Sequence, residues 1–490
     1  MKKILSGTLA VLMLFSCFIL SSCKKKKGGE EDESQPTVTT QDPGSDEGAV
    51  FTVPEDLNYG NRDFTILSYN CQAPEFGDTE GDMGDVVNYA LVQRDKFTEG
   101  RLGVKIVVKS RNGQFYDMND YADHIVSSIL GGEKAYDMIG SYSLVPTTLM
   151  VRGFLQDLND TKYLDFSKNW WASFVYNTCT LNNRTYFMTG DISTNLLYFM
   201  QVVAFNSRLL NENNIREEDL YAMVDNGEWT LDRFFEVASN ISAPDGEGNW
   251  TANAFYSVGM ANANMLDSFY IATGMHLFEI ENDNLTVSAN TTSDKVLNLY
   301  DKVYRSIYTD HIVNDPTNKP TFAEGKELFS IMTVIDLRTT LASTTFKDPV
   351  GVLPFPKYDE ADSYRTLIGS PHTQYYIPID AKDIDASSAV METQAYASYQ
   401  YVTPEVYYNV MKVRYSKDSN SSRMFDIIRS GSTTEFGILS YALFQGGAEP
   451  ASMFRNAILL QLTNWTSNFR GKFETGMKGV VGTLNDYYHS

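Results

Sequence analysis

Short apolar runs alternate with longer amphipathic segments over residues 63–142, and this alternation limits the possible fold more than any other sequence feature. Phe64–Tyr69, Val104–Val108 and Tyr136–Ile139 have the length and the β-branched or aromatic content of strands. The segments 87–97 and 121–130 carry apolar residues at helical spacing, and glycines follow both. Strand, helix, strand, helix and strand in this order predict an α/β fold with a largely parallel sheet.

Residues 1–22 have the pattern of a secretory signal peptide. Two lysines precede an apolar run from about Leu9 to Leu20, which is shorter than the ~20 residues of a membrane-spanning helix. The sequence Leu-Ser-Ser-Cys that ends at Cys23 resembles a bacterial lipobox, after which Cys23 would be lipidated and become the N-terminus. The alternative is an ordinary signal peptide with a chance cysteine. We therefore expect an extracytoplasmic chain held at the cell membrane by a lipid anchor that includes palmitate.

Residues 23–60 are expected to form a flexible tether. Lys24–Lys27 open this segment, and as far as about Pro54 it is polar, with few apolar side chains to compensate the entropy of ordering. The four lysines would lie beside anionic lipid headgroups, or they are simply solvated.

The bulk composition indicates a large, acidic, globular chain. Loss of residues 1–22 removes two lysines and moves the formal charge from −22 to −24. Such a surface repels phosphate backbones, which argues against a nucleic-acid partner. The hydrophobic content of 43% is ample for burial, and the length predicts two or three domains.

The cysteines and histidines do not indicate a metal site. Cys17 leaves with the signal peptide and Cys23 takes the lipid, so Cys71 and Cys179 form one disulfide or stay as buried thiols. The sequence contains no CxxC or HExxH spacing, no GxSxG elbow and no phosphate-binding loop. We expect no metal and no cofactor.

Later segments supply further elements and two candidate crossings between lobes. Gly190-Asp191 separates two apolar runs, and Gly369–Tyr376 is the second candidate. Thr230 and Ser293 are placed to begin helices, and a strand is expected to continue through Ile335. Most of the remaining sequence has helical periodicity.

Six pieces in the expected order resemble the extracellular solute-binding lipoproteins of bacterial ABC importers, family 1, which are maltose-binding-protein-like. They span most of residues 60–490. The pieces are the lipobox, Tyr136–Ile139 with Gly153–Leu158, Ala204–Asn206, Trp229–Asp232, Phe322–Lys326 and Gly351–Asp359. One departure concerns Ala254–Gly259, where the family often has a fuller Asp- and Gly-rich turn followed by Asp-x-Tyr-Gly. A particular substrate subgroup therefore does not follow from the resemblance.

The resemblance implies an α/β, two-lobed, periplasmic-binding-protein type II-like fold with hinge strands between discontinuous lobes. Lobe 1 would comprise residues 61–190 plus 374–430, and lobe 2 residues 195–370 plus 435–490. A small-molecule solute, expected to be a carbohydrate and more specifically an oligosaccharide, would bind in the cleft. Hinge closure around it would present a monomer to ABC permease subunits in the membrane.

Candidate solute contacts come from the carboxyl ends of the predicted strands and from the crossings, because open α/β sheets bind ligands there. The candidates are Tyr69, Asn70, Ser141, Tyr142, Asp191, Asn262, Thr333, Asp336 and His372. The tyrosines would stack on a sugar ring, and the smaller polar residues would hydrogen-bond to hydroxyls. The competing interpretation gives each of them a packing, capping or solvent-exposed role.

Two other functions stay open from the sequence. A surface lipoprotein with a sensory or structural role would carry the same signal peptide and lipobox. A glycan-acting hydrolase needs a pair of carboxylates, and 62 acidic residues make such pairs inevitable. Because no nucleophile or metal motif accompanies these carboxylates, we expect a binding protein and not an enzyme.

Overall fold

The computed structural model describes residues 50–317, 322–407, 419–444 and 450–490. The expected signal peptide, Cys23 and most of the tether lie outside the described residues, as does the part of an expected helix at 405–412 that follows residue 407. Residues 46–490 form one compact unit. Within the described ranges, no helix has the length and apolar character needed to cross a membrane.

The first sheet is the one that the alternation over residues 63–142 predicts. Its strands β1 (Arg62–Tyr69), β2 (Val104–Arg111) and β3 (Met138–Tyr142) are parallel, in the order β2-β1-β3. The strand β11 (Thr373–Tyr376) adds next to β3 in the antiparallel sense. Ile66 pairs with both neighbours of β1 and is fully buried, so the sheet is covered on its inner face.

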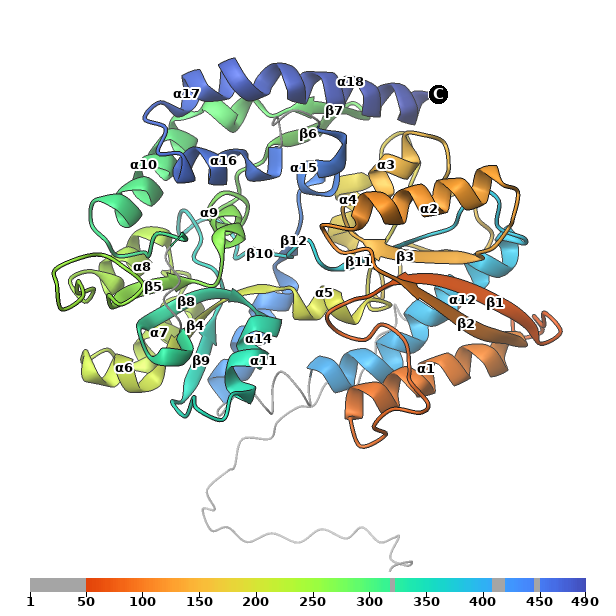
Figure 1. The fold of residues 1–490 in the computed structure, drawn as a ribbon, viewed down its shortest axis with the longest axis horizontal. Helices are drawn as coiled ribbons and strands as arrows, with labels where there is room; N and C mark the ends of the chain where they lie inside the picture. Colours follow the sequence, from red (N-terminus) through yellow and green to blue (C-terminus); the bar gives the residue numbers. More distant parts are fainter. Residues whose placement is uncertain (1–49, 318–321, 408–418, 445–449) are drawn as a thin grey trace, which may run out of the picture. The chain divides into compact units, whose positions relative to one another are not determined.

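The two helices expected between these strands are also present. In α1 (Val86–Leu102), the Asp85 carboxylate accepts hydrogen bonds from the first backbone N–H groups, and Gly103 ends the helix with a left-handed φ of 60°. Helix α2 (Met118–Leu130) lies on one side of the sheet, whereas α1 and α12 (Ile384–Ala397) lie together on the other (Figure 1).

A second, mixed sheet is built from later parts of the chain. The order is β5 (Tyr256–Met260), β8 (Glu327–Thr333), β4 (Gln201–Asn206) and β9 (Val350–Leu353). Strand β5 is parallel to β8, and β4 is antiparallel to both of its neighbours. Every residue of these four strands is buried, which is the pattern of a sheet covered on both faces.

Helices pack around this sheet, and two of them begin where the sequence predicts. The hydroxyl of Thr230 accepts from the backbone N–H of Arg233 at the start of α8, and Ser293 caps α10 in the same way. The helices of this region are α6 (Ser207–Glu212), α7 (Glu217–Asp225), α8 (Leu231–Ala238), α9 (Leu266–Ile271), α10 (Asp294–Tyr308), α11 (Val334–Ala342), α14 (Ser419–Ser430) and α16 (Pro450–Leu459).

The remaining strands and helices connect the two sheets or lie beside them. They are α3 (Pro146–Met150), α4 (Ser173–Cys179), α5 (Thr194–Tyr198), β6 (Phe278–Glu281), β7 (Asn284–Val287), β10 (Thr366–Leu367), β12 (Ser432–Thr433), α15 (Phe436–Leu439), α17 (Trp465–Asn468) and α18 (Thr475–His489). Single helical turns include η1 (Ala263–Met265), η4 (Ser398–Val402) and η6 (Tyr441–Leu443).

The chain passes from the first sheet to the second between β3 and β4, and it returns between β9 and β11. The outward passage runs through Gly190 and α5, and the return passage runs through β10. The two passages are hydrogen-bonded to each other, since the backbone N–H of Gly369 donates to the carbonyl of Phe199 at 2.8 Å. Strand β12 pairs with β10 beside them. Both candidate crossings therefore lie on passages between the sheets, while the residue boundaries of the lobes stay a prediction.

Two local expectations are resolved by the structure. The strand expected to continue through Ile335 ends at Thr333, because Thr333 and Asp336 form a capping box that begins α11 at Val334. Cys71 and Cys179 are both free thiols, so the open choice between a disulfide and thiols is settled for thiols.

Candidate functional site

Two tyrosines stand at the carboxyl ends of β1 and β3, as the strand pattern predicts. Tyr69 and Tyr142 are buried, and their rings meet edge to face with centroids 6.1 Å apart. The Tyr69 hydroxyl donates to the carbonyl oxygen of Pro371 at 2.5 Å, which fastens β1 to the return passage. Burial raises the pKa of both phenols above the ordinary value, so both remain hydrogen-bond donors at neutral pH.

The two predicted polar neighbours of these tyrosines have different surroundings. Asn70 is exposed, and its amide donates to the side-chain oxygen of Asn112 at 2.8 Å. Ser141 is fully buried inside β3, where its hydroxyl donates to the Tyr142 carbonyl at 3.2 Å. Asn70 is therefore accessible to a ligand, whereas Ser141 has a structural hydrogen bond.

Aromatic rings continue outward from Tyr142. Phe115 and Tyr116 follow β2, and the Tyr116 ring is 95% exposed. The centroid of Phe115 is 5.6 Å from that of Tyr441 in η6. Tyr441 is also close enough to Tyr142 to raise the pKa of its phenol. Exposed and half-buried rings near strand ends are the groups on which a sugar face stacks.

A buried ion pair lies on two helices of the second-sheet region. Asp267 of α9 is 8% exposed, and its Oδ2 lies 2.8 Å from Nη1 of Arg455 in α16. The same Nη1 donates to Oδ1 of Asn264 at 2.5 Å. The charge of Arg455 also partly opposes the rise in the Tyr142 pKa that burial causes, so the ion pair acts electrostatically on this first-sheet tyrosine.

The Asp267 carboxylate keeps an unused acceptor. Its Oδ1 is buried and receives no hydrogen bond from any described residue. Burial raises the Asp267 pKa to about 7, an effect that Arg455 partly opposes. A hydroxyl group of a ligand would satisfy this oxygen by donating a hydrogen bond to it. We call the whole group the strand-end cluster: Tyr69, Phe115, Tyr116, Tyr142, Asn264, Asp267, Tyr441 and Arg455.

The predicted residues of the second sheet have local structural roles. The side chain of Asn262 caps η1 by accepting from the backbone N–H of Asn264 at 2.9 Å. The Thr333 hydroxyl donates to Oδ2 of Asp336 at 2.6 Å, and the backbone N–H of Asp336 donates back to that hydroxyl. All three side chains therefore take part in capping the N-terminus of a helix.

His372 is a structural histidine of the return passage. It is fully buried, and burial lowers its pKa to about 4, so the ring is neutral at pH 7. Nδ1 lies 2.8 Å from the Gly369 carbonyl and must donate to it, which leaves Nε2 to accept from the Gln374 amide at 3.0 Å. Both ring nitrogens are occupied within the chain.

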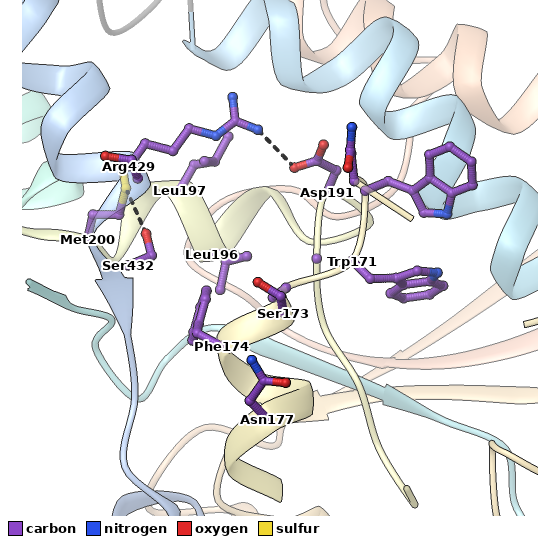
Figure 2. Close-up of a pocket in the computed structure, with 15 residues that line it drawn as sticks. Trp171, Ser173, Phe174, Asn177, Asp191, Leu196, Leu197, Met200, Arg429 and Ser432 are labelled. Atoms are coloured by element: carbon purple, nitrogen blue, oxygen red, sulfur yellow. Dashed lines mark hydrogen bonds and ion pairs between the residues drawn. The ribbon is translucent and has the colours of Figure 1, made fainter. Parts of the chain in front are cut away.

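Asp191 lies apart from the other candidates, in a cavity of about 340 Å³ beside the outward passage. We call this cavity the hinge pocket (Figure 2). Its walls include Ser173, Phe174, Asn177, Asp191, Leu196, Leu197, Met200, Arg429 and Ser432. No member of the strand-end cluster lines it. The nine predicted site residues thus divide into an exposed Asn70 and two buried tyrosines at the strand ends, structural groups, and Asp191 in a separate pocket.

Several residues of these sites were not among the sequence candidates. Phe115 and Tyr116 were within reach of the strand-end argument, because β2 ends at Arg111 and they lie in the loop that follows it. Asp267 and Arg455 are far apart in sequence and lie on helices, so no local pattern relates them. The same holds for Asp191 and Arg429.

Comparisons with known proteins support the fold. No protein-family model and no curated protein matches the sequence. Among solved structures, a cyclo/maltodextrin-binding protein complexed with maltotetraose is 15% identical, with a TM-score of 0.53 over 86% of this chain and 96% of that one. The galacto-N-biose/lacto-N-biose I-binding protein of an ABC transporter from Bifidobacterium longum is 16% identical, with a TM-score of 0.54 over 87% and 98%. UspC from M. tuberculosis is 14% identical, with a TM-score of 0.52 over 87% and 100%.

These similarities cover nearly the whole of each solved protein, and the sheets of this chain are open and mixed as described above. At 14–16% identity they establish the architecture and not the solute. The chain has the two-lobed α/β fold of the solute-binding proteins of ABC transporters, as the family 1 resemblance in its sequence predicted.

Proposed function

We propose that the chain is the solute-binding component of an ABC import system, and that it captures a carbohydrate at the strand-end cluster without altering it. The observation that carries this proposal is a group of exposed and half-buried aromatic rings beyond the carboxyl ends of the first-sheet strands, together with a buried Asp267–Arg455 pair whose charge acts on Tyr142. Two proteins of the same fold are complexed with maltotetraose and with lacto-N-biose, and these complexes support the choice of a carbohydrate.

The chemistry of the cluster suits a sugar. Tyr116 and Phe115 offer ring faces to the C–H face of a pyranose, while Asp267, Asn264 and Arg455 offer the planar acceptors and donors that match hydroxyl pairs. The cluster contains several accessible rings, Phe115, Tyr116 and Tyr441, which favours an oligosaccharide over a single ring.

The cluster also suits closure around the ligand. Tyr69 and Tyr142 belong to the first sheet, whereas Asp267 and Arg455 belong to helices near the second. A solute that touches both groups would favour the arrangement in which they face each other, which is a population shift driven by contacts made only in that state. The closed chain would then deliver the solute to a permease.

The signal peptide and Cys23 indicate where the chain would act. Acylation at Cys23 would hold the chain outside the cytoplasm, at the membrane that contains the permease, with residues 23–60 as the tether. Mass spectrometry of the membrane fraction should find an acylated N-terminal cysteine, and Cys23→Ser should release the chain. A mature chain with unmodified Cys23 would contradict the anchor.

Ligand screening tests the solute class. We expect saccharides, but not peptides, polyamines or metal ions, to raise the melting temperature of the purified chain. Asp267→Asn and Tyr116→Ala should each weaken saccharide binding about tenfold or more, because each removes one direct contact worth roughly 1.4 kcal/mol. Tyr89→Ala is the matched control, since Tyr89 is an exposed tyrosine of α1 outside the cluster. Stabilisation by peptides and none by saccharides would contradict the proposal.

Two further measurements separate a binder from an enzyme and an importer from a sensor. Bound saccharide should be recovered unchanged after prolonged incubation, whereas a hydrolase would release shorter products. Cells that lack the chain should lose uptake of that saccharide. Normal uptake in these cells would favour a sensory role.

A further inference from the structure

The hinge pocket has the dimensions and the lining of a second small-molecule site. Its volume of about 340 Å³ lies at the lower end of the range of about 300–1,000 Å³ for ligand pockets. In Figure 2, Phe174 and Asn177 of α4 face it from one side, and Arg429 and Asp191 approach each other across the top. Its contents would therefore meet aromatic side chains and several polar groups.

The charged pair of the pocket joins parts of the chain that belong to different sheets. Asp191 is held on the first-sheet side, since its backbone N–H donates to the Trp170 carbonyl at 2.8 Å. The indole N–H of Trp170 donates in turn to the buried Glu392 of α12 at 2.9 Å. Arg429 ends α14, which packs on β9 of the second sheet. The distance between Asp191 Oδ1 and Arg429 Nη2 is 3.3 Å.

Both members of this pair keep hydrogen-bonding capacity for a ligand. Asp191 Oδ2 is buried and receives no hydrogen bond from a described residue, although the Thr403 hydroxyl is near this carboxylate. Arg429 has five N–H donors and uses only Nη2 for a hydrogen bond to a described residue, while its guanidinium lies 4.9 Å from the centre of the Tyr407 ring. An acceptor and a donor held side by side match two adjacent hydroxyl groups.

Charge selects a neutral ligand. The Asp191–Arg429 pair is already neutralised, so an anion would compete with Asp191 for Arg429 and leave two negative charges together. A cation would compete with Arg429 for Asp191 and leave two positive charges together. A neutral polyhydroxy ring adds hydrogen bonds without breaking the ion pair, and the volume accommodates one ring better than a chain of rings.

We propose that the hinge pocket is a second binding site, for a neutral single-ring polyhydroxy compound whose adjacent hydroxyls bridge Asp191 and Arg429. This site is distinct from the strand-end cluster, because the two share no lining residue. Since the pair connects segments of the two sheets, an occupied pocket would hold these segments together and change the affinity of the strand-end cluster for its own solute.

Calorimetric titration of the full-length chain, in a detergent without a sugar headgroup, tests the site. The probes are glucose, galactose and myo-inositol, with glucosamine and glucuronate as charged counterparts. In the Asp267→Asn chain, where the strand-end cluster is impaired, at least one neutral probe should still bind with one-to-one stoichiometry. Its affinity should fall tenfold or more on adding Arg429→Gln or Phe174→Ala. The charged counterpart should bind at least tenfold more weakly.

A second arginine of α14 provides the matched control. Arg423 forms an ion pair with Asp225 and does not line the pocket, so Arg423→Gln should leave probe affinity unchanged. Asn177→Ala removes an exposed amide that lines the pocket, and it is the alternative pocket variant if Arg429→Gln does not fold. The proposal is overturned if no neutral probe binds, if pocket variants leave the affinity unchanged, or if glucuronate binds more tightly than glucose. Failure of oligosaccharides to bind would instead count against the strand-end site alone.

Discussion

Glu327 provides a sharp test of how burial controls the stability of the second sheet. It is the first residue of β8, it is 2% exposed, and it makes no ion pair with any described residue. Its carboxylate sits against the backbone of β5, where a Cβ added to Gly259 would lie only 1.8 Å from Glu327 Cδ. Burial raises the Glu327 pKa to about 7, with a small opposing effect from the Ser330 hydroxyl.

The magnitude and the sign follow from linkage. The pKa rises from the ordinary 4.5 to about 7, and because each pKa unit is equivalent to about 1.4 kcal/mol, the shift corresponds to about 3 kcal/mol in total. The folded chain holds this proton more tightly than the unfolded chain does. The stabilisation is therefore fully present below the unfolded pKa and is lost as the pH rises through the folded pKa. Most of the loss falls between pH 5 and pH 8.

Glu327→Gln keeps the shape of the side chain and removes its titration. We expect the variant to gain about 2 to 3 kcal/mol of unfolding free energy relative to the unchanged chain when the pH rises from 5 to 8. Urea titrations at both pH values measure this difference. Glu212→Gln, which breaks an exposed i,i+4 pair with Arg208, is the control and should change stability by under about 0.5 kcal/mol. An equal effect of Glu327→Gln at both pH values would refute the reasoning.

Three other predictions concern the site and its supports. Saccharide affinity should fall from pH 8 to pH 5.5 as Asp267 takes up a proton near its pKa of about 7, and calorimetry of Asp267→Asn should show no such fall. Glu392→Gln leaves one of two buried indole N–H donors unsatisfied, so urea titrations at pH 5 should show a loss of about 1–3 kcal/mol of unfolding free energy. Because burial raises the Glu392 pKa to about 7, the loss should be smaller at pH 8, where the unchanged chain holds an ionised carboxylate in the core. Thr333→Val removes the capping hydroxyl of α11 and should cost about 1 kcal/mol in urea titrations, whereas full stability would contradict the capping role.

The fold was largely predictable because its signals are local. Alternating strands and helices over residues 63–142, and the caps at Thr230 and Ser293, depend on neighbours within a few positions, and the structure has each of them. Thr333 shows where a local signal was misread. The spacing of Thr333 and Asp336 is that of a capping box, and it indicates a helix start as directly as the preceding apolar run indicates a strand.

The candidate site was less predictable because its pairs are formed across long separations. Tyr69 and Tyr142 could be predicted, because each is the last residue of a strand in the same sheet. The carboxyl ends of parallel strands lie at one edge of a sheet, so the two tyrosines come together there. Nothing local joins Asp267 to Arg455, or Asp191 to Arg429, since each pair depends on how α16 and α14 return to earlier elements. His372 was a candidate contact in the second crossing, and its burial and two hydrogen bonds favour the competing structural interpretation.

Hydrogen bonds fix parts of the two passages to the first-sheet side, and a hinge can lie only in the parts that are not fixed. The buried Glu75 carboxylate accepts from the Ser193 hydroxyl at 2.8 Å, the Thr194 backbone N–H at 2.7 Å and the Asn195 amide at 2.8 Å, and it is also hydrogen-bonded to the Thr373 hydroxyl. Both passages are therefore fixed to the first-sheet side up to Asn195 and from Ser370 onward, since Ser370 and Pro371 are also hydrogen-bonded to Ser143 and Tyr69. Movement of one sheet relative to the other would have to be absorbed in these passages between those points, over residues 196–200 and 366–369, where Leu196, Leu197 and Met200 also line the hinge pocket. A ligand in that pocket would contact the very segment that has to bend.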